Sequence, residues 1–183
     1  MRVRRDALAA LTPDGDLVPG GVAGAPEVWP FTQSNRFPWR RSSPRRLDPV
    51  NLVVLGADPS TVFAALAAAE WRRPSDGATH RTWVDGGFRT MEDHIALGDR
   101  AERVHVRLFR VDGLTLAAAH HEVAGRRGHH VVTSWDRARA EVAAALEPAG
   151  FTRIAPSAVV TPPGLRGVAS DGRAWRLVAP DPA

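Results

Sequence analysis

The 183-residue sequence contains no cysteine and no lysine. Without cysteine, the chain forms no disulfide bond and offers no thiolate ligand to a metal ion. All 24 basic side chains are arginine, and the net charge is only +4. We interpret this bias, together with the many alanine, glycine and proline residues, as the codon usage of a GC-rich bacterial genome. The arginine count alone therefore indicates no nucleic-acid partner, which would need its basic residues gathered on one face.

Long apolar segments are also missing. A membrane-spanning helix needs roughly 20 apolar residues, and the longest weakly polar run, 62–69, is shorter and rich in alanine. Asp14 and Asp16 interrupt the amino-terminal segment before it can form the apolar core of a signal peptide. We therefore expect a soluble, cytoplasmic protein.

Common catalytic signatures are absent as well. The sequence has no P-loop, no G-x-G-x-x-G loop, no G-x-S-x-G elbow and no H-E-x-x-H zinc motif. These absences exclude the usual sequence grounds for a nucleotide-binding fold, a serine hydrolase or a zinc protease.

The first 46 residues are rich in proline and glycine and predict an irregular arm. Within it, Arg36–Arg46 carries five arginines, no acid, and aromatic residues between them. We expect the aromatic side chains to dock on the core while the arginines stay solvated. An alternative is a peripheral contact between this segment and anionic lipid headgroups. Nucleic acid is the least favoured partner.

Residues 47–150 have the pattern of a folded α+β core. The apolar run 51–55 predicts a buried strand, and Asp58-Pro59 predicts the start of a helix that continues to Trp71. Weaker strands are expected at 82–84, 88–97 and 129–133, and stronger ones at 103–110 and 114–121. Thr133 and Asp136 resemble a capping box, so a second helix should begin near Ser134 and end at Gly150.

This order of elements predicts an antiparallel sheet with two main helices packed on one face. Residues 151–183 form a carboxy-terminal extension in which 158–160 and 175–178 are expected to add short edge strands.

The hairpin around Asp112-Gly113 allows a geometric prediction. If these two residues form the turn, paired residue numbers sum to 225 and His105 lies opposite His120, with Cβ atoms about 5 Å apart. Arg107 then lies over the small Ala118, while His121 points to the core side of the sheet. A three-residue loop would instead place His105 opposite His121, because a slip of one residue exchanges the faces.

Polar residues of the kind used in binding and catalysis gather in this half of the chain. They are His105, His120, His121, His129, His130, Asp93, Glu122, Asp136, Arg107 and Arg139. Imidazole is a metal ligand and a proton carrier near neutral pH, and guanidinium groups suit phosphate. In a strand, adjacent side chains point in opposite directions, so only one of each neighbouring histidine pair should serve a given site.

Several of these segments resemble the LssY carboxy-terminal domain family. Arg103–Phe109 is similar to its R-x-H-V-R-[LF]-[WF] strand, Ala118–Glu122 to its A-x-H-D segment, and His129–Arg139 to its H-H-x-D-x-x-x-D-x-E-R segment. Asp93 resembles an earlier Q-D element, and Pro49–Gly56 the opening P-x-N-x-x-x-x-G strand. The likeness covers about residues 47–150 and departs from the family at Glu122, Val132 and Ala138.

The resemblance implies a domain of unassigned activity that often accompanies membrane proteins, some with a type 2 phosphatidic acid phosphatase domain. Nothing in this sequence resembles the phosphatase motifs.

Three functions remain open. The first is binding of a small anionic, phosphate-bearing molecule or a lipid headgroup. We assign it to His105, Arg107, His129, His130, Arg139 and Asp93.

The second is a metal-dependent hydrolase. A divalent metal would be held by His105, His121 and His130, with His121, Glu122 and Asp136 as catalytic residues. The third is a structural or interaction module in which the polar residues brace the sheet. The predicted site depends on one condition: the side chains of His105, His121, His130, Asp136 and Arg139 must converge on one cavity, within about 8 Å of one another.

Overall fold

The computed structural model describes residues 31–34, 48–74, 80–84, 87–111, 113–125, 130–159 and 173–181. None of the helices in these residues has the length and apolar character needed to cross a bilayer. The predicted arginine-rich strip Arg36–Arg46 lies outside the described residues, as does His129.

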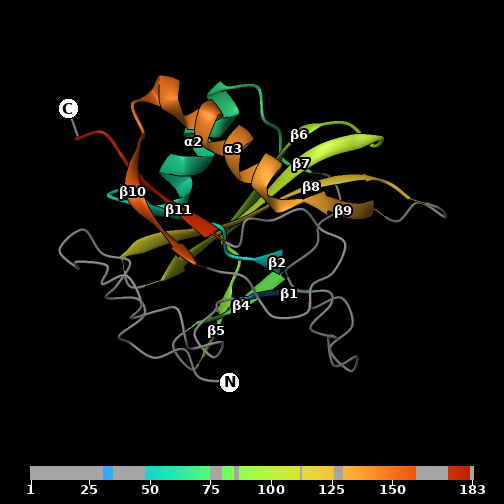
Figure 1. Cartoon of the computed structure of the whole chain (residues 1–183), viewed down its shortest axis with the longest axis horizontal. Coiled ribbons are helices and arrows are strands. Elements are labelled where there is room, and N and C mark those ends of the chain that lie inside the picture. The colour runs from blue at the N-terminus through green and yellow to red at the C-terminus, as the bar shows by residue number, and fades with distance from the viewer. Residues whose placement is uncertain are drawn as a thin grey trace.

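Strands dominate the described part of the chain (Figure 1). They are β1 (Phe31–Ser34), β2 (Asp48–Pro49), β3 (Leu52–Leu55), β4 (His80–Val84), β5 (Gly87–Thr90), β6 (Asp93–Gly98), β7 (Glu102–Val111), β8 (Leu114–Ala124), β9 (His130–Ser134), β10 (Thr152–Val159) and β11 (Arg173–Val178). The helices are α2 (Pro59–Ala68), α3 (Trp135–Leu146) and the short 3-10 helix η3 (Glu147–Ala149).

Within the described residues, seven strands form the main sheet in the order β10-β11-β3-β8-β7-β6, with β9 paired to β8 beyond the end of β3. A second sheet has the order β2-β1-β4-β5. Figure 1 shows α2 and α3 together on one side of the main sheet and the second sheet on the other side. The strands β4 and β5 contact β7, and β2 contacts β8.

The helix starts follow from local chemistry. Asp58 caps α2 by accepting a hydrogen bond from the Thr61 amide at 2.8 Å, and Pro59 occupies the first turn, as predicted. The second helix also begins near the predicted residue, but Ser134 is its cap: the Ser134 hydroxyl accepts from the Arg137 amide at 3.0 Å. Thr133 is therefore not the capping residue, and the predicted Thr133–Asp136 capping box is wrong.

The core on the helix side of the main sheet contains alternating residues of the β7–β8 hairpin. Val104, Val106 and Leu108 of β7 and Ala117 and Ala119 of β8 pack there. Residues of both helices complete this core: Val62, Leu66, Ala138, Val142, Ala143 and Leu146. A separate apolar cluster on the opposite face comprises Val50, Val53, Leu55, Phe109, Leu114, Leu116 and Ala118.

The predicted α+β class, with two main helices on one face of a sheet, is confirmed. The sheet is mixed rather than wholly antiparallel, because β11 runs parallel to β3, pairing Trp175 with Leu52 and Val178 with Leu55. The segment 151–183 therefore contributes strands to the main sheet itself: β10 is an edge strand, but β11 lies between β10 and β3. This pairing joins segments about 120 residues apart in sequence. A turn motif in the local sequence therefore cannot predict it.

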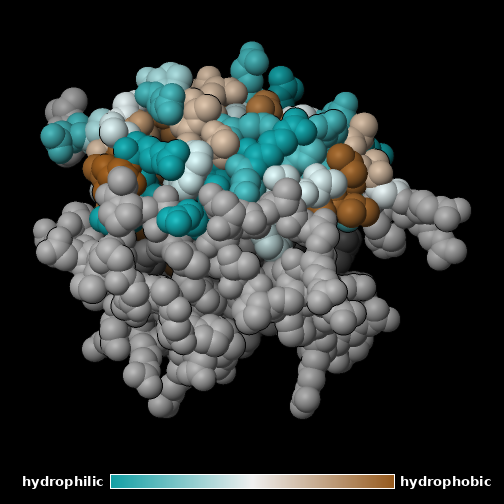
Figure 2. Space-filling model, viewed as in Figure 1, coloured by the Kyte–Doolittle hydropathy of each residue, from teal (hydrophilic) through white to brown (hydrophobic). Residues whose placement is uncertain are grey.

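The described surface gives little sign of a binding face. In Figure 2, hydrophilic residues cover much of the described part of the visible face, and hydrophobic residues form small separate groups. Of the large hydrophobic residues whose burial is described, Leu97 and Val131 are exposed, at 38% and 52%.

Candidate functional site

A row of polar side chains lies on the face of the main sheet that the helices do not cover. The β7–β8 register matches the two-residue turn: Val111 pairs with Leu114, and His105 with His120. Because side chains alternate along a strand, Arg103, His105 and Arg107 of β7 share this face. His120 and Glu122 of β8 lie on the same face, next to Ala118 and the apolar cluster beyond it.

The neighbouring strands add a histidine at each side. His94 of β6 pairs with Arg107, and its Nδ1 lies 3.2 Å from Nε2 of His105. His130 of β9 places its Nδ1 3.4 Å from Oε1 of Glu122 and 3.2 Å from a terminal nitrogen of Arg103. We call this set the polar cluster; its members are His94, Arg103, His105, Arg107, His120, Glu122 and His130.

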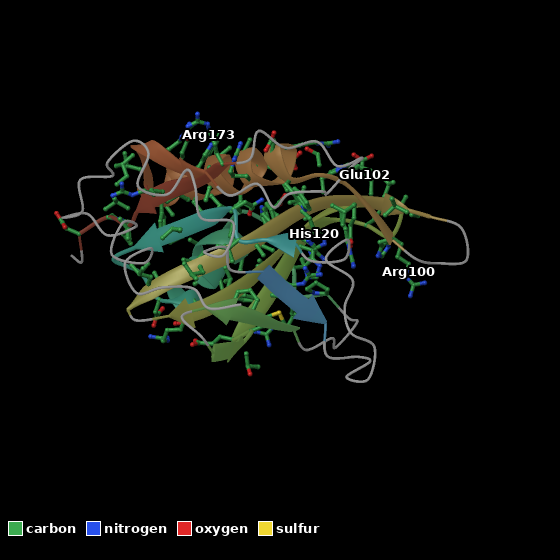
Figure 3. The ribbon with its side chains drawn as sticks, turned by 60° about the horizontal axis from the view of Figure 1, so that its bottom comes forward. Arg100, Glu102, His120 and Arg173 are labelled. Atoms are coloured by element: carbon green, nitrogen blue, oxygen red, sulfur yellow. The ribbon has the colours of Figure 1, made fainter. Side chains whose placement is uncertain are left out.

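The centre of the polar cluster is buried. His105 and His120 are 2% and 1% exposed, and Glu122 is 6% exposed. The rings of His105 and His120 meet edge to face, with centroids 5.1 Å apart. Figure 3 shows His120 among nitrogen-bearing side chains, well separated from Arg173. Buried polar groups need partners to offset the loss of water, and here the members of the cluster provide them for one another.

Glu122 is held by two donors. The Arg103 Nε donates to Oε1, and Nε2 of His120 lies 3.1 Å from Oε2. The Arg107 guanidinium lies 3.5 Å from Nδ1 of His120. Since a guanidinium only donates, Nδ1 of neutral His120 is the accepting nitrogen, and Nε2 carries the proton donated to Glu122.

The tautomer of neutral His130 follows from its partners in the same way. Its Nδ1 faces a donor of Arg103, and its Nε2 lies 3.3 Å from the backbone oxygen of Arg100, which only accepts. The proton of neutral His130 therefore lies on Nε2.

Two members have clearly displaced pKa values. Burial alone would raise the pKa of Glu122, but the hydrogen bonds from His120 and Arg103 and the positive charge of the Arg103 guanidinium outweigh it and bring the pKa to about 2. Burial lowers the pKa of His105 well below its ordinary value, and the positive charge of Arg107 lowers it further. At neutral pH the cluster therefore contains an ionised Glu122 and a neutral His105.

His121 lies on the other face of the sheet. It pairs with Val104, whose side chain packs in the helix-side core. Its Nδ1 is 2.6 Å from the Thr133 hydroxyl, and its Nε2 is 2.8 Å from Oε1 of Glu102. A groove of about 520 Å³ is lined by His121, Glu102 and Arg137 among others. The hydrogen bond from His121, followed by the bond and charge of Arg137, lowers the pKa of Glu102.

The other predicted residues also lie away from the polar cluster. Arg139 of α3 donates to the backbone oxygen of Arg173, lies 3.3 Å from Asp136 and stacks 4.6 Å from the Trp175 ring centre. Asp93 pairs with Leu108, on the helix face, and makes a 2.6 Å ion pair with Arg73.

The predicted convergence of His105, His121, His130, Asp136 and Arg139 is therefore wrong, since His121 and α3 lie across the sheet from His105. The structure does bring together four predicted residues: His105, Arg107, Glu122 and His130. The predicted metal set of His105, His121 and His130 is divided between the two faces, and so are the predicted catalytic residues His121 and Glu122.

Three members of the cluster were not assigned to the site from the sequence. His120 could have been, because the predicted register already placed it opposite His105. Arg103 also had a signal, since it alternates with His105 and Arg107 along one strand. His94 had none, because its position depends on how β6 aligns with β7.

One trio within the cluster has the composition of a metal site. His105, His120 and Glu122 each offer a ligand atom, and these atoms all lie within 4.8 Å of one another. Two imidazoles and one carboxylate are ligands that zinc and several other divalent transition metals accept.

No family model matches the chain, and neither a curated protein nor a solved structure does.

Proposed function

We propose that the polar cluster binds the phosphate group of a small anionic molecule or of a lipid headgroup. The observation that carries the proposal is the placement of Arg103 and Arg107 on either side of His105, on one face of β7, with Glu122 as the carboxylate between β7 and β9. Guanidinium groups donate in pairs in the plane that phosphate oxygens require.

Burial supports this function in a second way. Arg107 is 8% exposed and His105 is 2% exposed, so hydrogen bonds made there act in a medium less polar than water and are stronger. Each guanidinium carries five N–H donors, whereas the cluster contains one carboxylate, Glu122. The cluster is thus richer in donors than in acceptors, as an anion site requires.

The family stays a prediction. We propose that residues 47–150 are a domain of the LssY carboxy-terminal type, because the segments Arg103–Phe109 and Ala118–Glu122 resemble segments of that family. In support, the polar residues of these two segments pair across β7 and β8. The family's frequent association with lipid phosphatase domains fits a phosphate-bearing ligand.

The test is ligand-induced stabilisation. The melting temperature of the full chain is measured with inorganic phosphate and with a soluble phosphate monoester such as glycerol phosphate, against sulfate and chloride at equal ionic strength. Sedimentation with vesicles containing phosphatidic acid, against phosphatidylcholine vesicles, distinguishes a lipid headgroup from a soluble ligand.

Arg107→Ala is the test variant and Arg110→Ala is its control. Arg110 lies on the same strand but is exposed, where it pairs with Glu92 at 3.0 Å and Asp58 at 3.3 Å. The phosphate-dependent rise in melting temperature, measured from each variant's own baseline, should disappear in Arg107→Ala and persist in Arg110→Ala. No rise in the wild-type chain, or an equal rise in Arg107→Ala, contradicts the proposal.

A further inference from the structure

The spacing within the trio His105, His120 and Glu122 is close to that of ligands around a single ion. Ligands about 2.0–2.2 Å from a tetrahedral zinc ion are about 3.3–3.6 Å from one another. Nε2 of His120 and Oε2 of Glu122 are already 3.1 Å apart, and no two of the three ligand atoms are separated by more than 4.8 Å. Small side-chain movements would bring all three to one ion.

We propose that His105, His120 and Glu122 bind one divalent transition-metal ion, and that this ion and Arg107 hold the same phosphate group. The inference rests on the proposed function, since the ligand it describes is the phosphate-bearing molecule of the same cluster. In this trio His120 and Glu122 replace two residues of the set predicted from the sequence: His121, which lies on the other face of the sheet, and His130. Two nitrogens and one oxygen suit zinc, iron or manganese and leave positions open for a ligand.

Hydrogen bonds around the trio keep its acidic member in position. Arg103 holds Oε1 of Glu122, which leaves Oε2 for the ion. His94 contacts the His105 ring from β6, with ring centroids 5.3 Å apart. Partners of this kind orient ligand side chains and are a regular part of metal sites.

Binding the ion also changes the role of Arg107. In the metal-free cluster, Nδ1 of His120 accepts from Arg107 and Nε2 carries the proton. When Nε2 bonds to the ion, the proton of the neutral ring must lie on Nδ1, and two donors then face each other across 3.5 Å. Arg107 therefore turns away from His120 and toward the phosphate oxygens.

Charge makes the two ligands depend on each other. A dication beside Arg103 and Arg107 is repelled, and Glu122 is the carboxylate of the trio. A phosphate group offsets this repulsion, so metal and phosphate should strengthen each other's binding by the same factor. Coupling energies of this kind typically correspond to about 5–150-fold.

The experiment is isothermal titration of EDTA-treated, untagged full chain with Zn²⁺ and Mn²⁺, with and without methylphosphonate as a phosphate probe that cannot be hydrolysed. We expect one ion per chain for at least one of the two metals, and at least about tenfold tighter binding with the phosphonate. His120→Ala is the test variant, and His121→Ala is the control: both histidines are buried neighbours on β8, but they lie on opposite faces.

Metal binding should be lost in His120→Ala and retained in His121→Ala. If His120→Ala does not fold, the absorption spectrum of the wild-type chain with Co²⁺ replaces it: a visible ligand-field band that changes on adding phosphonate is expected. Any of three results overturns the inference: no stoichiometric metal bound to the wild-type chain, metal affinity in His120→Ala equal to that of the wild type, or metal affinity that phosphonate does not change.

These outcomes separate the two proposals. If the EDTA-treated chain still binds phosphate and metal has no effect, the metal site fails and the proposed function stands. If neither phosphate nor phosphonate binds in any metal state, the proposed function fails as well.

Discussion

Replacing Glu122 by glutamine removes the only carboxylate of the metal trio and leaves the shape of the side chain nearly unchanged. Glu122 is 8% exposed at its side chain, and its partner Arg103 is 16% exposed. Its pKa falls from 4.5 to about 2 on folding. At about 1.4 kcal/mol per pKa unit, the ionised form stabilises the folded chain by about 3 kcal/mol at neutral pH. Breaking a buried ion pair by removing one partner costs a similar amount, about 3–5 kcal/mol.

We therefore expect Glu122→Gln to lower the free energy of unfolding by about 2–4 kcal/mol at pH 7, allowing the amide to keep part of the hydrogen bonding. The assay is urea unfolding followed by tryptophan fluorescence, in buffer with EDTA and without phosphate. A group whose pKa is lowered by folding contributes its stability above its unfolded pKa and loses it as the pH falls toward the folded value. The difference between wild type and variant should thus be constant above pH 5 and shrink between about pH 4.5 and pH 2.

Glu102→Gln is the matched control. Glu102 also contacts a histidine and an arginine, at 2.8 Å each, but its side chain is 53% exposed. Exposed ion pairs contribute little, so this variant should unfold close to the wild type. The reasoning is refuted if Glu122→Gln unfolds at the wild-type urea concentration at pH 7, or if its deficit does not shrink in acid.

Three further predictions concern the frame that positions the cluster. In thermal unfolding, Gly98→Ala should lower the stability of the folded chain by about 2–4 kcal/mol, because φ is +107° and an added Cβ would lie 2.4 Å from the Glu102 backbone oxygen. Gly113→Ala should cost only about 1–2 kcal/mol in the same assay, because its φ is +79° but its added Cβ would meet open space. Ser134→Ala removes the cap of α3 and should cost about 1 kcal/mol by urea unfolding, and an unchanged midpoint would contradict the assignment of the cap. Leu116→Ala removes a fully buried side chain from the apolar cluster on the same face and should cost about 2–5 kcal/mol by calorimetry. A loss below about 1 kcal/mol would show that the apolar cluster is not tightly packed.

The β7–β8 hairpin was the most predictable part of the molecule. Its alternating residues and two-residue turn fixed the register, and the register fixed the pairing of His105 with His120. The same reasoning placed His121 on the core side, whereas the hydrolase hypothesis assigned it to the site. The structure agrees with the register, because the alternation of side chains is a property of the backbone and does not depend on function.

The rest of the site depended on long-range pairing. His94 reaches His105 only because β6 aligns with β7 through the turn near Gly98. A register shift between His121 and Glu122 in the β8–β9 pair determines where His130 meets Glu122, and such irregularities leave no clear signal in one sequence. Asp136 and Arg139 lie outside the polar cluster because α3, which carries them, packs on the opposite face of the sheet.

The most direct test of the central claim is a crystal structure of the wild-type chain grown with tungstate, whose anomalous scattering marks the position of a tetrahedral oxyanion. The account predicts an anomalous peak within hydrogen-bonding distance of the Arg107 guanidinium, on the His105 face of β7. A well-diffracting crystal with no peak there, or with tungstate only on exposed arginines elsewhere, would contradict it.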